Sequence, residues 1–437
     1  MERQYKDSGI EWIGRIPKDW KTTKLFNLCT IKGRIGWNGL RSDEFKEKSY
    51  AYLVTGQDFI SSDINWERCY QIDKERYDED PFIQLSNGDI LITKDGTIGK
   101  IAKVSNMDKP ACLNSGIFVL KQRKNTFVQN YLYWYLVSPI LLAYNAFVNS
   151  GGTTIMHLYQ NVFERFPLLI PAFSEQQRIA EYLNGKCGEI DRLIELQEQM
   201  IVQLTVYKQS VIKEAVTKGL NPDVQLVPSH INWIGDIPKG WKTYALKWLM
   251  KLNAGATPKS DDETLWDGDI SWITPADYKT EDIYISRGRR NISQKGINSC
   301  ATTILPENSI IFSKRAPIGL VVINDKPLCT NQGCIGCIPN PTRALSKYYY
   351  YTLSIYKEQF ELYGSGTTFK EISATNFANF TVPVPPIDEQ QSISEYLDAK
   401  CGEINKLIEI KCQKIETLRE YRKSVIYEAV TGKTNIG

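Results

Sequence analysis

The residues of this 437-residue chain that are best suited to chemistry are cations on glycine-rich loops. Lys94, Thr97 and Lys100 lie in the segment KDGTIGK, and Lys314 and Arg315 lie in the similar segment KRAPIG. Such turns present backbone N–H groups and positive side chains together, a combination that suits phosphate oxygens. These loops indicate a surface for a polyanion.

Two further clusters combine basic residues with amides or an aromatic ring. The loop 34–41 contains Arg34, Trp37 and Asn38, and the segment 287–291 contains three arginines. Arg and Asn are the residue types that pair with the edges of guanine and adenine in the major groove. Both clusters therefore predict contacts to DNA bases.

Two Gly-Thr-Thr segments each follow a glycine break after a predicted helix, a geometry that favours anion contacts. Two matching segments, 54–59 and 273–278, also predict turns after strands. They contain Gln57 and Asp58 in domain 1 and Asp277 in domain 2. The predicted DNA-binding residues are Arg34, Asn38, Gln57, Asp58, Lys94, Thr97, Lys100, Thr153, Thr154, Asp277, Arg287, Arg289, Arg290, Lys314, Arg315, Thr367, Thr368 and Lys370.

Catalytic motifs find little support. The chain has two histidines, His157 and His230, which is too few for most histidine-based metal or nucleophile sites. The segment GTIGK lacks the glycine spacing of a phosphate-binding P-loop, and Cys334-x-x-Cys337 has no second ligand pair nearby. We expect these two cysteines to be buried thiols. The sequence therefore predicts a non-catalytic chain with no metal or cofactor of its own.

The segment that must position these loops is a repeat. Residues 174–217 and 388–431 share more than half of their aligned positions, and each carries apolar residues at steps of three and four. That pattern is typical of a coiled-coil seam, so we expect two long helices packed antiparallel. The predicted seam consists of Leu183, Ile190, Leu193, Leu204, Tyr207, Val211, Leu397, Ile404, Leu407, Leu418, Tyr421 and Val425.

The repeat also extends beyond the helices. The segment SGIEWIGRIPKDW at 8–20 recurs as SHINWIGDIPKGW at 229–241. This order divides the chain into a lead-in segment (1–20), domain 1 (20–173), a central spacer helix (174–220), the repeated lead-in (221–240), domain 2 (241–387) and a C-terminal spacer helix (388–432).

The two domains share little sequence but show the same pattern of short β-type runs bounded by Gly, Asn, Asp and Pro. Each then shows one amphipathic helix, near 128–148 and 343–363. The predicted fold class is therefore α+β: two mixed α/β domains joined by two long helices that form an antiparallel coiled coil, with an internal pseudo-twofold.

Composition gives weaker constraints. The net charge of +3 is nearly balanced, and the 42% hydrophobic content is sufficient for real cores. The ten scattered cysteines favour free thiols in a reducing compartment, and no apolar run reaches the length of a membrane span. We therefore expect a cytoplasmic protein without membrane segments.

On the paired lead-in segments, the Glu-Gln-Gln-x-Ile-x-Glu-Tyr-Leu starts of the helices and the GTIGK and GGTT turns, the chain resembles the DNA-specificity subunit of type I restriction–modification enzymes. The resemblance implies two target-recognition domains that read a bipartite, asymmetric site on double-stranded DNA, the expected partner. It also implies two methyltransferase subunits that bring S-adenosylmethionine, and two motor–nuclease subunits that bring ATP hydrolysis and Mg²⁺.

Two alternatives belong to other classes. The first is a coiled-coil protein-interaction scaffold with two ligand-binding domains, which would not select DNA sequences. The second is a self-sufficient methyltransferase or nuclease, against which the missing cofactor motifs count.

Overall fold

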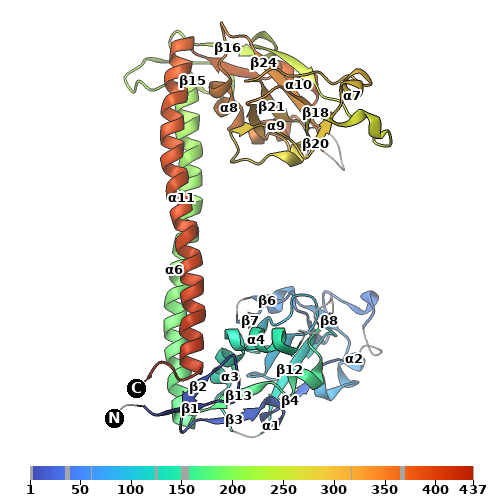
Figure 1. Cartoon of the computed structure of the whole chain (residues 1–437), viewed down its shortest axis with the longest axis vertical. Helices are drawn as coiled ribbons and strands as arrows, with labels where there is room; N and C mark the ends of the chain where they lie inside the picture. Colours follow the sequence, from blue (N-terminus) through green and yellow to red (C-terminus); the bar gives the residue numbers. More distant parts are fainter. Residues whose placement is uncertain are drawn as a thin grey trace. The chain divides into compact units, whose positions relative to one another are not determined.

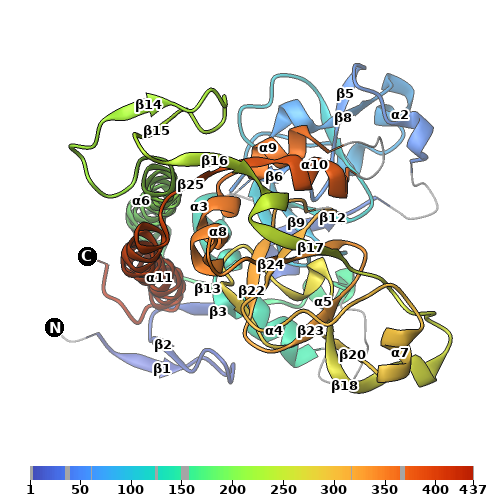
Figure 2. The same cartoon turned by 90° about the horizontal axis from the view of Figure 1, so that it is seen from above.

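Two long helices run through the structure, α6 (Phe173–Lys218) and α11 (Ile387–Val430). This computed structural model describes residues 3–34, 40–60, 62–123, 126–148, 157–315, 317–364 and 370–436. The chain divides into two compact units, and each unit takes part of both helices (Figures 1 and 2). Unit 1 comprises Met1–Glu198 with Gln413–Gly437, and unit 2 comprises Gln199–Cys412.

The two helices pack antiparallel within unit 1. The Arg422 guanidinium lies 2.8 Å from the Asp191 carboxylate, and Arg419 lies 3.4 Å from Glu198, so residue numbers rise along α6 as they fall along α11. Apolar side chains of the first part of α6 share one core with those of the last turns of α11. Burial of this shared apolar face is the main stabilising term for such a pair.

Unit 2 contains the reciprocal arrangement. Lys208 donates a 2.8 Å hydrogen bond to the Asn405 side chain, while Val211 and Val216 share a core with Leu397 near the start of α11. The antiparallel packing predicted from the sequence is therefore confirmed inside each unit. The pseudo-twofold relation between the units stays a prediction.

The seam between the helices keeps a strict alternation of three- and four-residue steps. Leu183, Ile190, Val211, Leu397, Ile404 and Val425 are buried in it as predicted, and Leu204 and Leu418 are half-buried. The remaining seam positions are Cys187, Ile194, Gln197, Ile201, Lys208 and Ala215 of α6 and Cys401, Ile408, Lys411, Ile415, Arg422 and Ala429 of α11.

The seam prediction was wrong for Leu193, Tyr207, Leu407 and Tyr421, which are exposed. The seam continues four residues after Ile190, where the prediction assumed three. Leu193 is followed by another apolar residue at 194, so both steps offer an apolar side chain and the sequence alone does not separate them. The exposed residues lie on a face beside the seam.

Both ends of the two long helices have identifiable stabilising residues. The helices begin at Phe173 and Ile387. Gln176 and Gln390 hold the helix starts, each accepting a backbone hydrogen bond from its domain at 2.8 and 2.9 Å. Glycines with positive φ follow the helices, for example Gly219 at 74°.

Domain 1 is built from short sheets in unit 1. A four-stranded sheet has the order β10–β9–β12–β4, and a three-stranded sheet has the order β11–β5–β8 with β11 parallel to β5. The strands are β4 (Cys29–Lys32), β5 (Ala51–Val54), β8 (Tyr70–Ile72), β9 (Ile90–Thr93), β10 (Ile101–Lys103), β11 (Ala111–Leu113) and β12 (Ile117–Gln122). Two-stranded pairs complete the unit: β1 (Tyr5–Asp7) with β2 (Arg15–Pro17), β3 (Lys21–Lys24) with β13 (Pro167–Ile170), and β6 (Phe59–Ile60) with β7 (Asp63–Ile64).

Domain 2 repeats this plan in unit 2. Its sheets have the orders β17–β24–β21–β22–β19 and β20–β18–β23, with β23 parallel to β18. The strands are β17 (Met250–Ala254), β18 (Trp266–Ile273), β19 (Tyr284–Ile285), β20 (Arg290–Ile292), β21 (Ile310–Ser313), β22 (Val321–Asn324), β23 (Leu328–Thr330) and β24 (Cys334–Pro339). The pairs are β14 (Leu226–Pro228) with β15 (Asp236–Pro238) and β16 (Lys242–Ala245) with β25 (Thr381–Val384).

The single helix predicted in each domain is divided in two. Domain 1 has α3 (Gln129–Val137) and α4 (Pro139–Val148), separated at Pro139, which lacks the N–H that a continuous helix needs. Domain 2 has α8 (Ser346–Ser354) and α9 (Lys357–Leu362). Within the described ranges, no single helix has the length and apolar character to cross a membrane, although α3 and α4 taken together, bent by 58°, meet that test on length and composition.

The lead-in tryptophans tie each domain to the spacer helices. Trp20 Nε1 donates to Glu175 at 3.0 Å, and Trp241 Nε1 donates to Glu389 at 2.9 Å. These carboxylates are the Glu of the two Glu-Gln-Gln motifs, which explains why the tryptophan and the motif recur together. The contacts fix where each domain leaves its helix pair.

Candidate nucleic-acid interface

The two domains share one structural frame for their candidate site. In domain 1, β5 pairs with β8 on one side and β11 on the other; in domain 2, β18 pairs with β20 and β23 in the same senses. The predicted cationic turns follow β9 and β21, and the segments around Asn114 and Asn331 follow β11 and β23. The fold therefore brings together loops that are far apart in the sequence.

The turn that follows β5 and β18 is stabilised by its own aspartate. The Asp58 carboxylate accepts hydrogen bonds from the backbone N–H and hydroxyl of Thr55 at 2.7 and 2.8 Å, and Asp277 does the same for Thr274 at 2.7 Å in each bond. Both carboxylates are nearly buried. The structure thus gives Asp58 and Asp277 a role in building the turn, whereas the sequence analysis placed them against DNA.

In domain 1 these loops line a pocket of about 650 Å³. The turn residue Gln57 and the cationic-loop residues Thr97 and Lys100 are exposed along it, as predicted for residues that meet a ligand. Phe45 and Tyr70 form an aromatic wall, with ring centroids 5.5 Å apart. The pocket combines stacking surface, amide groups and a cation, which are the elements used to hold nucleic-acid bases and phosphates.

Two cations predicted for this surface lie further inside. Arg34 is buried and donates from Nε to the Leu113 carbonyl at 3.0 Å, so it braces the edge of β11. Lys94 is half-buried, and its ammonium lies 5.1 Å from the centre of the Phe118 ring. The structure therefore gives Arg34 an internal partner, where the sequence analysis expected an open loop.

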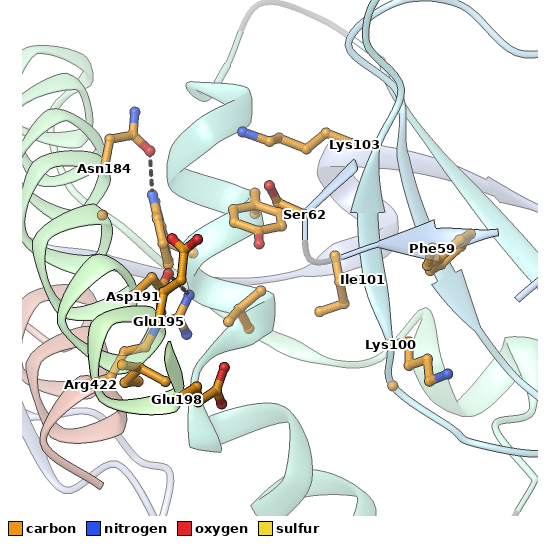
Figure 3. A pocket seen from close by; sticks show the side chains of 16 residues that line it. Phe59, Ser62, Lys100, Ile101, Lys103, Asn184, Asp191, Glu195, Glu198 and Arg422 are labelled. Atoms are coloured by element: carbon orange, nitrogen blue, oxygen red, sulfur yellow. Dashed lines mark hydrogen bonds and ion pairs between the residues drawn. The ribbon is translucent and has the colours of Figure 1, made fainter. Parts of the chain in front are cut away.

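A groove of about 770 Å³ in unit 1 separates domain 1 from the spacer helices (Figure 3). Asp191, Glu195 and Glu198 of α6 line one wall, and Lys100 and Lys103 lie on the domain side. The opposite signs of the two walls make this groove a poor place for a phosphate backbone. Lys100 lines both the groove and the 650 Å³ pocket, so it stands at the rim between them.

Trp134 of α3 lines this groove. Its Nε1 donates to the Asn184 side chain at 2.8 Å, and the Arg422 guanidinium lies 5.5 Å from its ring centre. In unit 2, Tyr351 of α8 donates a 2.7 Å hydrogen bond to Asp398, the repeat counterpart of Asn184. Each domain is thus held to its helix pair by an aromatic residue, on α3 in domain 1 and on α8 in domain 2.

In domain 2, Arg287 and Arg289 of the arginine cluster line a smaller pocket of about 480 Å³. Arg289 is fixed, because its guanidinium donates to the Ala276 carbonyl at 2.7 Å and lies 3.6 Å from Asp277. Arg290 is also fixed, with its guanidinium 3.5 Å from the centre of the Trp266 ring. Arg287 is exposed and lines the pocket.

The cationic turn of domain 2 is partly neutralised. Glu371 accepts from Lys314 at 2.8 Å and from Arg315 at 2.7 Å. Burial raises the pKa of Glu371, but the hydrogen bonds from the two cations more than offset this, and its pKa is lowered overall. Only part of the charge predicted for this loop is therefore available to DNA, while Lys370 is exposed.

Five predicted residues lie outside the described part of the chain: Asn38, Thr153, Thr154, Thr367 and Thr368. Their contacts stay predictions.

The groups considered for catalysis are occupied elsewhere. His157 Nδ1 pairs with Asp95, linking the segment after α4 to the cationic turn. Cys334 and Cys337 are buried as expected, and burial raises the pKa of the Cys334 thiol to about 12. Among the described residues, no cluster of three or more His, Cys, Asp or Glu could hold a metal ion.

Sequence reasoning missed several residues of the two pockets. Phe45 and Tyr70 lie in segments that contain no glycine-rich turn, and only the pairing of β8 with β5 brings Tyr70 to the pocket. Asp267 of domain 2 lies outside the basic clusters and the matching turns that contain the predicted DNA-binding residues. The Trp-Asp-Gly-Asp segment around it carries the one usable signal, because Asp-Gly favours an irregular turn.

Comparison with known proteins agrees with this arrangement. The family model of the type I restriction modification DNA specificity domain matches the chain twice, over residues 17–205 and 238–418. The putative type I restriction enzyme MjaX specificity subunit of Methanocaldococcus jannaschii is 26% identical over 437 residues, covering 97% of this chain and 96% of that protein. The MjaIX specificity subunit of the same organism is 38% identical over 193 residues, which is 43% of each chain.

Solved structures share the fold. A chain from a study of complex assembly and conformational transition of the type I R-M system aligns with a TM-score of 0.74 at 16% identity, covering 96% of this chain and 99% of that one. The HsdS subunit from Thermoanaerobacter tengcongensis aligns with a TM-score of 0.52 at 16% identity, covering 96% and 98%. The twofold match of the family model along most of the chain decides the assignment: the chain belongs to the family of type I restriction–modification DNA-specificity subunits.

Proposed function

We propose that this chain reads a bipartite, asymmetric DNA site, with one half read by each domain, and directs partner subunits to methylate adenine or to cleave. The chain itself supplies recognition. S-adenosylmethionine, ATP and Mg²⁺ belong to the partners in this proposal, and the complex would act in the cytoplasm.

One observation carries the proposal: the two domains share the same strand pairing but have different side chains at matching positions. The β5–β8 pairing in domain 1 has the same register as β18–β20 in domain 2, so Tyr70 corresponds to Arg290 and Gln71 to Asn291. In the preceding loop, Glu67 stands where domain 2 has Arg287. Because base readout depends on which donors and acceptors face the groove, these differences support two unlike half-sites.

Gln71 shows how far the two domains diverge. Its side-chain oxygen accepts from the Ser49 backbone at 2.7 Å and from Lys109 at 2.8 Å, and the residue is nearly buried. Asn291, at the matching position, is exposed. The same strand position therefore stabilises domain 1 and faces solvent in domain 2.

The spacer helices support two equivalent partners. Three apolar positions are exposed to almost the same extent in both repeats: Leu193 and Leu407 (44% and 46%), Leu196 and Ile410 (41% and 48%), and Tyr207 and Tyr421 (51% and 49%). We call these six residues the exposed stripe. Repeated exposure of large apolar side chains marks a protein-interaction surface, because single exposed apolar residues have no reason to recur.

In each unit the stripe consists of two aliphatic residues and one tyrosine. Unit 1 contributes Leu193, Leu196 and Tyr421, and unit 2 contributes Leu407, Ile410 and Tyr207. In our proposal one methyltransferase subunit binds each set of three residues, so the complex contains two methyltransferase subunits. The motor–nuclease subunits would join that complex.

Exchange of domain 2 tests the proposal. Residues 241–387 are replaced by the equivalent segment of a relative with another specificity, and the full chain is assembled with its methyltransferase partner. The proposal expects a change in one half of the selected DNA sequence, because domain 1 is untouched. A change in both halves, or no sequence selection by the wild-type complex, would contradict it.

A further inference from the structure

We infer that Asp267, Arg287 and Asn291 form a base-reading cluster in domain 2, which contacts a guanine and a neighbouring base that carries an amino group. This inference rests on the proposed function, because it names the residues and base types by which domain 2 would read its half-site.

The backbone holds Asp267 in an unusual position. Trp266 and Ile270 both pair with Ile292, so the three residues between them form a bulge in β18. Asp267 has a φ of 55°, in the left-handed region that non-glycine residues seldom adopt. Bulges re-aim side chains, and such strained positions are concentrated at functional sites.

The loop that carries Arg287 is clamped to the same strand. Gly288 donates from its backbone N to the Ser271 hydroxyl at 2.7 Å, and a Cβ built on Gly288 would lie 2.4 Å from the Trp272 carbonyl oxygen. No residue larger than glycine fits this approach. Arg287 therefore leaves the sheet from a fixed point, which reduces the entropy lost when it binds.

The side chains of the three cluster residues differ from those of the neighbouring arginines, because they have no hydrogen-bond partner among the described residues. Arg289 and Arg290 are engaged by Ala276 and Trp266, as described above. Asp267, Arg287 and Asn291 are exposed around the 480 Å³ pocket, and no described residue hydrogen-bonds to their side-chain atoms. A carboxylate, a guanidinium and an amide thus converge with their hydrogen-bonding capacity unused.

Asp267 decides what kind of contact this cluster makes. A carboxylate is repelled by phosphates, so on a DNA-facing surface its stable partner is a base amino group, the N4 of cytosine or the N6 of adenine. Arg287 can pair with both O6 and N7 of guanine, and Asn291 suits adenine. Together the three residues favour base edges in the major groove over the backbone.

Domain 1 has no equivalent cluster, since Glu67 stands at the position of Arg287 and β5 has no bulge at its start. The inference therefore applies to one half-site only, which makes the other half an internal control.

The test uses the full chain assembled with its methyltransferase partner. The complex is incubated with DNA in which the half-site of domain 2 is randomised, and the bound DNA is sequenced. For R287A we expect loss of a guanine preference at one position, with binding to the wild-type sequence weakened by roughly 5- to 150-fold. For D267G, which suits the positive φ, we expect loss of preference at another position of the same half.

Two further variants separate base reading from charge. R287K keeps the charge but cannot pair bidentately, so it should lose the guanine preference and retain the salt dependence of binding. D269A removes another exposed carboxylate of the same bulge, outside the pocket, and should select the wild-type sequence.

Retained selection by domain 1 shows that each variant is folded and assembled. Unchanged selection by both R287A and D267G would overturn the inference while leaving the proposed function intact. A wild-type complex that selects no sequence would overturn the proposed function itself, and the inference with it.

Discussion

The exposed stripe leads to a quantitative prediction for subunit assembly. Replacing Leu193 and Leu196 with Asp in unit 1 should remove one methyltransferase subunit, because both leucines would be buried under it. Fully burying a leucine stabilises by roughly 1.5–3 kcal/mol. Leu193 is 44% exposed and Leu196 is 41% exposed, so the fraction still available to a partner is a little under half of each.

Together the two leucines would therefore contribute about 1.3–2.6 kcal/mol to docking, which corresponds to a 10- to 80-fold change in affinity. The carboxylates of the L193D/L196D variant must also lose water on docking, so this range is a lower bound. The equivalent variant of unit 2, L407D/I410D, should weaken the other copy by a similar factor.

Native mass spectrometry of the assembled complex measures the outcome. Each double variant should retain one methyltransferase subunit at concentrations where the wild type carries two, and the combined variant should retain none. Val202 provides a matched control: it is 64% exposed but its repeat counterpart is Glu416, so V202D should keep both subunits. Two subunits bound with wild-type affinity to L193D/L196D would refute the assignment of the stripe.

Three further predictions concern stability and charge. Gln197 lies buried in the seam, and its side-chain oxygen has no partner among the described residues. Because Q197L removes an unsatisfied group that costs about 1–2 kcal/mol, it should raise the melting temperature of unit 1 by about 2–8 °C in calorimetry, and an unchanged or lower melting temperature would contradict this. Gly188 lies inside α6, and a Cβ added at this position would meet open space. G188A should therefore stabilise the chain by about 1 kcal/mol, measured by denaturant unfolding. Destabilisation would show that the helix needs glycine there. The Glu371 pKa is lowered in the folded state, so its ion pairs with Lys314 and Arg315 stabilise the fold at pH values above its ordinary pKa and are lost as the pH falls. E371Q should release both cations, tighten DNA binding at low salt and steepen the salt dependence of binding by up to about 2 in logarithmic slope. An unchanged slope would place these cations away from DNA.

Much of the architecture was predictable because it depends on patterns with a clear physical signal. The repeat of Trp20 and Glu175 as Trp241 and Glu389 marks a contact that each unit needs, and identical motifs give identical contacts. The α+β class and the antiparallel helices follow from runs of apolar residues with definite periods.

The seam prediction failed where it had to choose between two neighbouring residues. Leu193 and Ile194 are both apolar, and only packing against α11 shows that Ile194 belongs to the seam. Residue type also misled where a polar group serves the fold, because Arg34 and Asp58 look like DNA ligands but bond to their own domain. Asp267 was not predicted, because it lies neither in a basic cluster nor in one of the matching turns, and only the bulge in β18 brings it to the pocket.

The central claim is that two domains built on one frame read two different half-sites for shared partners. The most direct measurement is mapping of methylated adenines in DNA modified by the wild-type complex in a host without other adenine methylation. The account predicts a motif with two unlike specified halves separated by a fixed unspecified gap. A single uninterrupted motif, or two halves of the same sequence, would contradict it.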